Sequence, residues 1–176
     1  MTLNGAIISN VQPGISGTVE AGVMQKGHVS IGAGSRVRPN SYITGPVIIG
    51  EGCEIGPGAC IKPATSIADN VVVSPLTVIK NSVIGDDVHI GAGSIIEDSV
   101  IDKGSIIGGR FTACSGEAEV KIDTEHHTVK TGVMIGEGCN LADSITAQPG
   151  VIIGNYCQVR SLKLLGGWFP DQSVVV

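Results

Sequence analysis

The sequence predicts an all-β protein, a parallel β-helix of hexapeptide repeats with about seven triangular coils. The main observation is an aliphatic residue at every sixth position, without a slip, at Ile31, Val37, Ile43, Ile49, Ile55, Ile61, Ile67, Val73 and Ile79. A period of six fits neither an amphipathic helix nor an alternating strand, and it is the signature of a hexapeptide β-helix. Three hexads should make one coil, with neighbouring rungs about 4.8 Å apart.

Composition is the second observation. The 176 residues include only two Phe, two Tyr and one Trp, whereas Gly reaches 26. That is too little aromatic volume for an ordinary core, but a solenoid buries a ladder of Ile and Val instead. Charged residues make up 15% and the net charge is −5. This balance argues against nucleic-acid binding, which normally requires a basic face.

The repeats define the organisation of the chain. After short slips the aliphatic positions resume at Ile84, Ile90, Ile96, Ile101, Ile107, Ile135, Leu141, Ala147, Ile153, Val159 and Leu165. We expect a lead-in over residues 1–18 and a single β-helix domain over 19–166. Residues 109–130 lose the hexad and should form an excursion loop. Residues 167–176 should form a C-terminal cap that covers the exposed end of the solenoid.

The chain shows no basic segment followed by an apolar run at its start, and no long apolar stretch, so we expect a cytoplasmic protein that does not enter a membrane. The cysteine count is odd, at five, and no CxxC occurs. Disulfides and a zinc site are therefore not expected. Cys53, Cys139 and Cys157 share one place in the hexad, which suits a small buried side chain.

The residue before each inward aliphatic should point outward. From residue 72 onward these positions become largely apolar, and contiguous exposed apolar surface usually marks an interface. We expect a homotrimer through the face formed by Val72, Val78, Val83, Ile95, Val100 and Ile106. His89 should lie between Val72 and Ile106 on neighbouring rungs and so interrupt an apolar column of this face. It is either an interface histidine that forms a hydrogen bond across subunits or a catalytic base at the subunit boundary.

Lys62 and Lys80 each follow an inward isoleucine and lie eighteen residues apart, so they should occupy one corner on neighbouring rungs. Two stacked ammonium groups repel unless an anion or a carboxylate lies between them. One interpretation is an ion pair between Lys80 and Glu97, one rung further. The other is a substrate site for a sugar phosphate or a nucleotide.

A family resemblance rests on the stretches GPVIIGEGCEIGPGACIKPATSI and VIKNSVIGDDVHIGAGSIIEDSVI. They resemble the C-terminal left-handed β-helix of archaeal sugar-1-phosphate nucleotidylyltransferases that carry a second, acetyltransferase activity. The C-terminal half of the bacterial N-acetylglucosamine-1-phosphate uridylyltransferase is a more distant relative. The resemblance covers roughly residues 15 to 165 and implies the left hand, a trimer and acetyl-CoA as a candidate cofactor. It does not include the nucleotidylyltransferase half.

The acetyltransferase residues of that family carry over only in part. Lys62 stands where the family has an arginine before proline, and Lys80 matches a lysine that contacts substrate. The histidine, tyrosine and asparagine that the resemblance leads us to expect fall at Ala92, Ile95 and near Cys114. Alanine cannot accept a proton from an amine, so a catalytic base would have to be relocated. The candidates for that role are His89, His126 and His127.

Two functions follow from these observations. The first is a transferase that moves an acetyl group from acetyl-CoA to an amino-sugar phosphate. The second is a domain that has lost this chemistry but still trimerises or binds a nucleotide sugar. A γ-class carbonic anhydrase shares the coil, but His28, His89, His126 and His127 do not match the spacing of its three zinc ligands.

Overall fold

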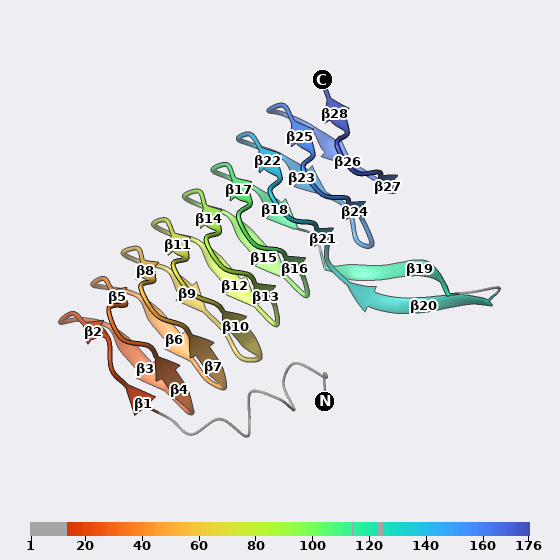
Figure 1. Ribbon diagram of the computed structural model, residues 1–176. Helices are drawn as coiled ribbons and strands as arrows, with labels where there is room; N and C mark the ends of the chain where they lie inside the picture. The colour runs from red at the N-terminus through yellow and green to blue at the C-terminus, as the bar shows by residue number, and fades with distance from the viewer. Residues whose placement is uncertain (1–13, 114, 123–124) are drawn as a thin grey trace.

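Short parallel strands form the three sides of a triangular solenoid, a left-handed parallel β-helix (Figure 1). The computed structural model describes residues 14–113, 115–122 and 125–176. Consecutive strands lie on consecutive sides, and every third strand returns to the same side one rung further along. We name the three sides sheet A, sheet B and sheet C.

Sheet A contains β1 (Gly14–Ile15), β4 (Val29–Ile31), β7 (Val47–Ile49), β10 (Thr65–Ile67), β13 (Val83–Ile84), β16 (Val100–Ile101), β21 (Met134–Ile135), β24 (Ile152–Ile153) and β27 (Trp168–Phe169). Sheet B contains β2 (Thr18–Val19), β5 (Arg36–Val37), β8 (Glu54–Ile55), β11 (Val72–Val73), β14 (His89–Ile90), β17 (Ile106–Ile107), β22 (Asn140–Leu141), β25 (Gln158–Val159) and β28 (Val174–Val175). Sheet C contains β3 (Met24–Lys26), β6 (Tyr42–Thr44), β9 (Cys60–Ile61), β12 (Val78–Lys80), β15 (Ile95–Glu97), β18 (Thr112–Ala113), β23 (Thr146–Ala147) and β26 (Leu164–Leu165).

The predicted ladder of inward aliphatic residues forms the core. From Ile31 to Leu165 every one of these side chains is at most 3% exposed. Each of these residues stacks on the inward residue of the next rung, as Ile61 does on Ile79 in sheet C. Complete burial of such a side chain contributes roughly 1.5–3 kcal/mol. The six-residue period therefore predicts directly which side chains are buried from water.

The solenoid has about nine turns rather than the seven predicted. At the C-terminal end β27 pairs with β24 and β28 pairs with β25, so the tail continues the coil. Its inward side chains, Phe169 and Val175, pack against the core. At the other end β1 and β2 pair with β4 and β5. The remainder of the predicted lead-in, residues 1–13, lies outside the described residues.

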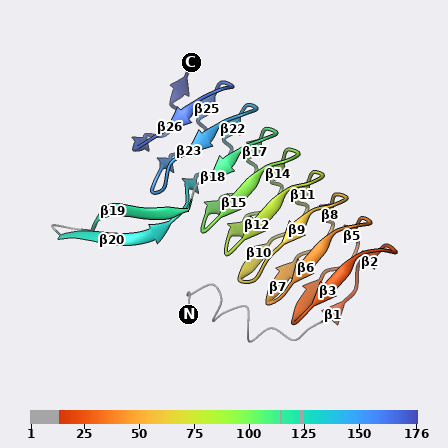
Figure 2. The same ribbon diagram turned by 180° about the vertical axis from the view of Figure 1, so that it is seen from behind.

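The predicted excursion is an antiparallel hairpin of β19 (Gly116–Ile122) and β20 (Glu125–Thr131). It leaves the solenoid between sheet C and sheet A and projects away from the stack in both views (Figures 1 and 2). The coil itself retains Thr112–Ala113, which form β18 and pair with β15 and β23. The excursion therefore starts later than residue 109.

Glycine is needed at the corners for two different reasons. At Gly32, which follows an inward isoleucine, a Cβ would lie 2.5 Å from the backbone carbon of Gly50 on the next rung. Close approach of the two neighbouring rungs, rather than backbone strain, excludes a side chain there. At Gly34 the backbone has φ near +75° instead, a conformation that glycine adopts readily. Asn40 adopts a similar left-handed conformation at an equivalent turn.

Candidate functional site

Lys62 and Lys80 lie at the same corner on neighbouring rungs, as predicted. The preceding residues, Ile61 and Ile79, are register partners in sheet C. Both lysines are half-buried. Glu97 is the register partner of Lys80 on the following rung. Within the described residues, however, no carboxylate lies within 4.0 Å of either ammonium group, so the predicted Lys80–Glu97 ion pair is not formed. We call Lys62 and Lys80 the lysine corner.

The neighbouring carboxylate of Asp98 is held by the base of the hairpin. Asn81 Nδ2 donates a hydrogen bond of 2.5 Å to Asp98 Oδ1, and Ser115 Oγ donates to Asp98 Oδ2. Lys130 Nζ lies 3.7 Å from Asp98 Oδ2. No pattern in the sequence predicts this cluster, because Ser115 and Lys130 reach Asp98 only through the path of the hairpin.

The environment of Asp98 favours its charged form. Burial alone would raise the pKa of this carboxyl group, but the hydrogen bonds from Asn81 and Ser115 and the charges of Lys130 and Lys80 outweigh it. The pKa of Asp98 is therefore lowered from its ordinary value. Asp98 is consequently an anion that anchors the hairpin, and it lies beside the lysine corner without pairing with it.

Tight packing fixes the hairpin where it meets the coil. A Cβ on Gly132 would lie 2.0 Å from the carbonyl oxygen of Glu97, so the chain can return to sheet A only through glycine. On the opposite side, a Cβ on Gly150 would lie 2.6 Å from the Cβ of Ala118 in β19. The hairpin is thus clamped from both sides next to the lysine corner.

The candidate histidines lie on different parts of the molecule. His89 is exposed on sheet B, and its register partners are Val72 and Ile106, which confirms the predicted column. His126 and His127 belong to β20, where His127 is exposed and the side chain of His126 lies outside the described residues. The structure therefore brings the hairpin to the lysine corner, but it places His89 on another face of the same chain.

The six residues of the predicted trimer interface do not form one patch. Val83 and Val100 lie on sheet A, Val72 and Ile106 on sheet B, and Val78 and Ile95 on sheet C. The physical reason is that each hexad turns the chain onto the next side of the triangle. Sheet C carries an outward column of Met24, Tyr42, Cys60, Val78 and Ile95. Sheet A carries a second one in its C-terminal half, which we call the sheet A column: Val83, Val100, Met134, Ile152 and Trp168, which are 36–69% exposed.

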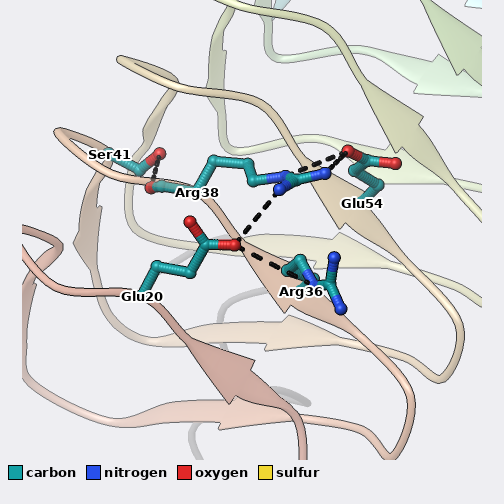
Figure 3. A network of polar contacts seen from close by, with 5 residues as sticks. All are labelled: Glu20, Arg36, Arg38, Ser41 and Glu54. Carbon is teal, nitrogen blue, oxygen red and sulfur yellow. Dashed lines mark hydrogen bonds and ion pairs between the residues drawn. The ribbon is translucent and has the colours of Figure 1, made fainter.

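An ion-pair network occupies the first turns of sheet B, where Arg38 lies between two glutamates (Figure 3). Its Nη1 atom lies 3.2 Å from Glu20 Oε1, and its Nη2 atom lies 2.8 Å from Glu54 Oε1. Arg36 Nε lies 3.9 Å from the same oxygen of Glu20. Two carboxylates thus neutralise the charge of Arg38.

The cysteines behave as small core residues. Cys53, Cys139 and Cys157 are at most 1% exposed and free of disulfides, as predicted. Burial raises the pKa of the Cys53 and Cys139 thiols, so both stay protonated near neutral pH. Over the described ranges, no three His, Cys, Asp or Glu side chains gather as a metal site would require. The same part of the chain contains no helix long and apolar enough to span a membrane.

Comparison with known proteins places this architecture in a family. A family model described as the GMPPB C-terminal domain matches residues 19–125. The chain is 30% identical over 144 residues to the bifunctional protein GlmU of Carboxydothermus hydrogenoformans, a match that covers 73% of this chain and 32% of that protein. GlmU of Acinetobacter baumannii is 28% identical over 152 residues and covers 86% of this chain and 32% of that protein. This chain thus spans about a third of these curated relatives' length.

Solved structures agree on the fold. LpxA, a UDP-N-acetylglucosamine acyltransferase from Bacteroides fragilis, superimposes with a TM-score of 0.64 at 15% identity, over 91% of this chain and 69% of that chain. WeeI from Acinetobacter baumannii superimposes with a TM-score of 0.50 at 22% identity, over 64% of this chain and 51% of that chain.

Fold and comparisons together define the class of protein, a left-handed parallel β-helix domain built of hexapeptide repeats. More particularly, the chain belongs to the GMPPB C-terminal domain family and is related to nucleotidylyltransferases.

Proposed function

We propose that this domain binds a sugar phosphate or a nucleotide sugar at the lysine corner. The observation that carries the proposal is the stacking of Lys62 and Lys80 on neighbouring rungs without a carboxylate partner among the described residues. Neighbouring rungs are only about 4.8 Å apart, so the two ammonium groups repel each other. A phosphate group bound between them would relieve that repulsion and accept charge-assisted hydrogen bonds from both.

The state of Asp98 supports this proposal. Its carboxylate interacts electrostatically with Lys80, but its oxygens are held by Asn81, Ser115 and Lys130. The lysine corner therefore keeps its positive charge in a protein whose net charge is −5. The base of the hairpin lies beside Asp98 and next to the corner, where a bound sugar could contact it.

Calorimetric titration with glucosamine-1-phosphate and galactosamine-1-phosphate tests the proposal. Lys62→Ala and Lys80→Ala should each weaken binding roughly tenfold, because each removes a charge-assisted contact. Lys103→Ala is the matched control, since this exposed lysine lies at another corner and pairs with Glu137. Equal affinity in all three variants would rule out the lysine corner as the site.

A second candidate function is acetyl transfer from acetyl-CoA to an amino-sugar phosphate. The exposed imidazole of His89 between Val72 and Ile106 favours it, because a base at an apolar surface can act once a second subunit covers it. The base would take a proton from the amine as the new N–C bond forms. The C–S bond of the thioester would then break, and the CoA thiolate would leave and take up a proton.

Release of the CoA thiol, measured with a thiol reagent, tests this second function. Turnover that is lost in His89→Ala, His126→Ala or His127→Ala would identify the relocated base. Binding of the sugar phosphate without thiol release would instead support a domain that has lost its transferase chemistry. Ala92, which replaces the expected histidine, is exposed at a corner and offers no proton acceptor.

We also propose that the domain is a homotrimer and that the sheet A column forms the contact. Five apolar side chains in unbroken register offer a continuous surface for a neighbouring copy. Sedimentation velocity at micromolar concentration should show a trimer, and Val100→Lys with Met134→Lys should dissociate it. A wild-type monomer would contradict the proposal.

A further inference from the structure

A hollow on the outside of sheet B, near the C-terminal end of the solenoid, has the features of a second anion site. Its volume is about 220 Å³, and it is lined by Asn140, Ala142, Gln158, Val159, Arg160 and Val174. Asn140 and Gln158 are register partners on neighbouring rungs, so their side-chain amides project from the same face. Among the residues that the structure describes, neither amide nor Arg160 has a side-chain hydrogen bond or an ion pair.

Arg160 occupies the same place in its coil as Arg38 does near the start of the solenoid. Each follows the inward valine of a strand of sheet B, Val37 or Val159. Each donates its backbone N–H to the carbonyl of the inward residue one rung further. Because the backbone settings match, any difference between the two guanidinium groups must come from their neighbours.

The neighbours of the two arginines differ at two positions, one on the preceding rung and one on the following rung. Arg38 is neutralised by Glu20, in the same row one rung earlier, and by Glu54, the outward residue one rung later (Figure 3). The corresponding positions around Arg160 hold Ala142 and Val174. Both carboxylates are thus replaced by small apolar side chains, and the space that they would fill is the hollow.

The geometry points to a phosphoryl-binding site formed by Arg160, Asn140 and Gln158. The guanidinium group offers paired N–H donors that match two phosphate oxygens, and the two amides offer further donors. Ala142 and Val174 line the hollow with apolar surface, which suits the uncharged remainder of a phosphorylated small molecule. The site lies on sheet B and is independent of the lysine corner, which lies at the end of sheet C.

Isothermal titration of the full chain with inorganic phosphate, pyrophosphate and acetate, at constant ionic strength, tests this inference. We expect phosphate and pyrophosphate to bind, and Arg160→Gln to weaken them roughly tenfold or more. Val174→Glu should abolish binding in a folded protein, because it restores the carboxylate that Arg38 has. Lys103→Gln is the charge-matched control and should bind as the wild type does.

Several outcomes would overturn the assignment. These are no binding of phosphate or pyrophosphate, equal binding by the wild type and Arg160→Gln, or acetate binding as tight as that of phosphate. Lys62→Ala with Lys80→Ala separates the two sites: loss of phosphate binding there, with Arg160→Gln unaffected, would assign it to the lysine corner. Circular dichroism of each variant establishes that the β-helix is intact.

Discussion

Arg38 and Arg160 share one backbone position near opposite ends of the same solenoid, yet one is neutralised and the other is not. Two glutamates one rung away hold Arg38, whereas an alanine and a valine flank Arg160. In a repeat protein each rung contacts only its neighbours, so a side chain acquires its role from the rungs beside it. A binding group can therefore arise on this scaffold by the loss of a partner, without any change in the backbone.

The substitution with the largest effect on stability lies between the two arginines, among the residues that directly follow the inward residue of each sheet B strand. This residue is Gly108, where a Cβ would lie 2.5 Å from the backbone carbon of Ala142. Gly108→Ala should therefore destabilise the protein by about 1–3 kcal/mol or more, since backbone atoms must shift. Urea unfolding measures this loss. Gly14→Ala, with open space around it, is the control and should change stability little.

The Asp98 cluster offers a half-buried counterpart to the exposed Arg38 network. The folded-state pKa of Asp98 lies below the unfolded-state value, so its ionised form stabilises the fold above about pH 4. That contribution disappears as the pH falls through the lowered pKa. Asp98→Asn should therefore reduce the urea midpoint at pH 7 and have little effect at pH 2.

Asp102→Asn is the matched control for this pH dependence, because Asp102 is exposed and its carboxylate accepts a hydrogen bond from the neighbouring amide of Lys103. A difference between wild type and Asp98→Asn that stays constant between pH 7 and pH 2 would contradict the role of Asp98.

Removing the two glutamates that pair with Arg38 should give this arginine the surroundings of Arg160. The double substitution Glu20→Ala and Glu54→Val copies the surroundings of Arg160 at the N-terminal end. We expect it to create an additional phosphate site, visible in calorimetry as a higher stoichiometry. An unchanged stoichiometry would show that the amides of Asn140 and Gln158 are required as well as an unpaired guanidinium group.

The smallest effect should come from breaking the exposed network. Arg38→Gln leaves Glu54 without its cation and Glu20 with only the longer contact to Arg36. The effect is small because solvent and salt screen charges at this surface. The thermal midpoint should fall slightly at low ionic strength, and the difference should shrink in 1 M NaCl. A salt-independent loss would show that packing of the arginine stem, rather than its charge, stabilises the first turns.

The hexad period was enough to predict the core, the stacking of Lys62 on Lys80 and the column of His89. It failed where the relevant neighbours are not one repeat apart. Ser115 and Lys130 meet Asp98 only because the hairpin folds back, and no periodicity encodes that contact. The hollow at Arg160 has no sequence motif either. It forms because the neighbouring rungs carry Ala142 and Val174 at the positions where Arg38 has glutamates.

The predicted apolar interface failed for a geometric reason. Outward residues that follow one another in the sequence, such as Val78 and Val83, lie on different sides of the triangle. Only residues three strands apart share a side. The two ends were undercounted because the hexads shorten there: Phe169 follows Leu165 by four residues, yet both point inward.

The hairpin is an insertion that leaves the pairing of the coils unchanged. β16 pairs with β21 in the same parallel manner as any neighbouring strands, although the hairpin lies between them in the sequence. Without residues 116–131, five residues would join the inward Ala113 to the inward Ile135, as five join Ile61 to Ile67. Evolution or a protein engineer could therefore exchange this protrusion like a cassette, changing what the corner recognises while the solenoid stays the same.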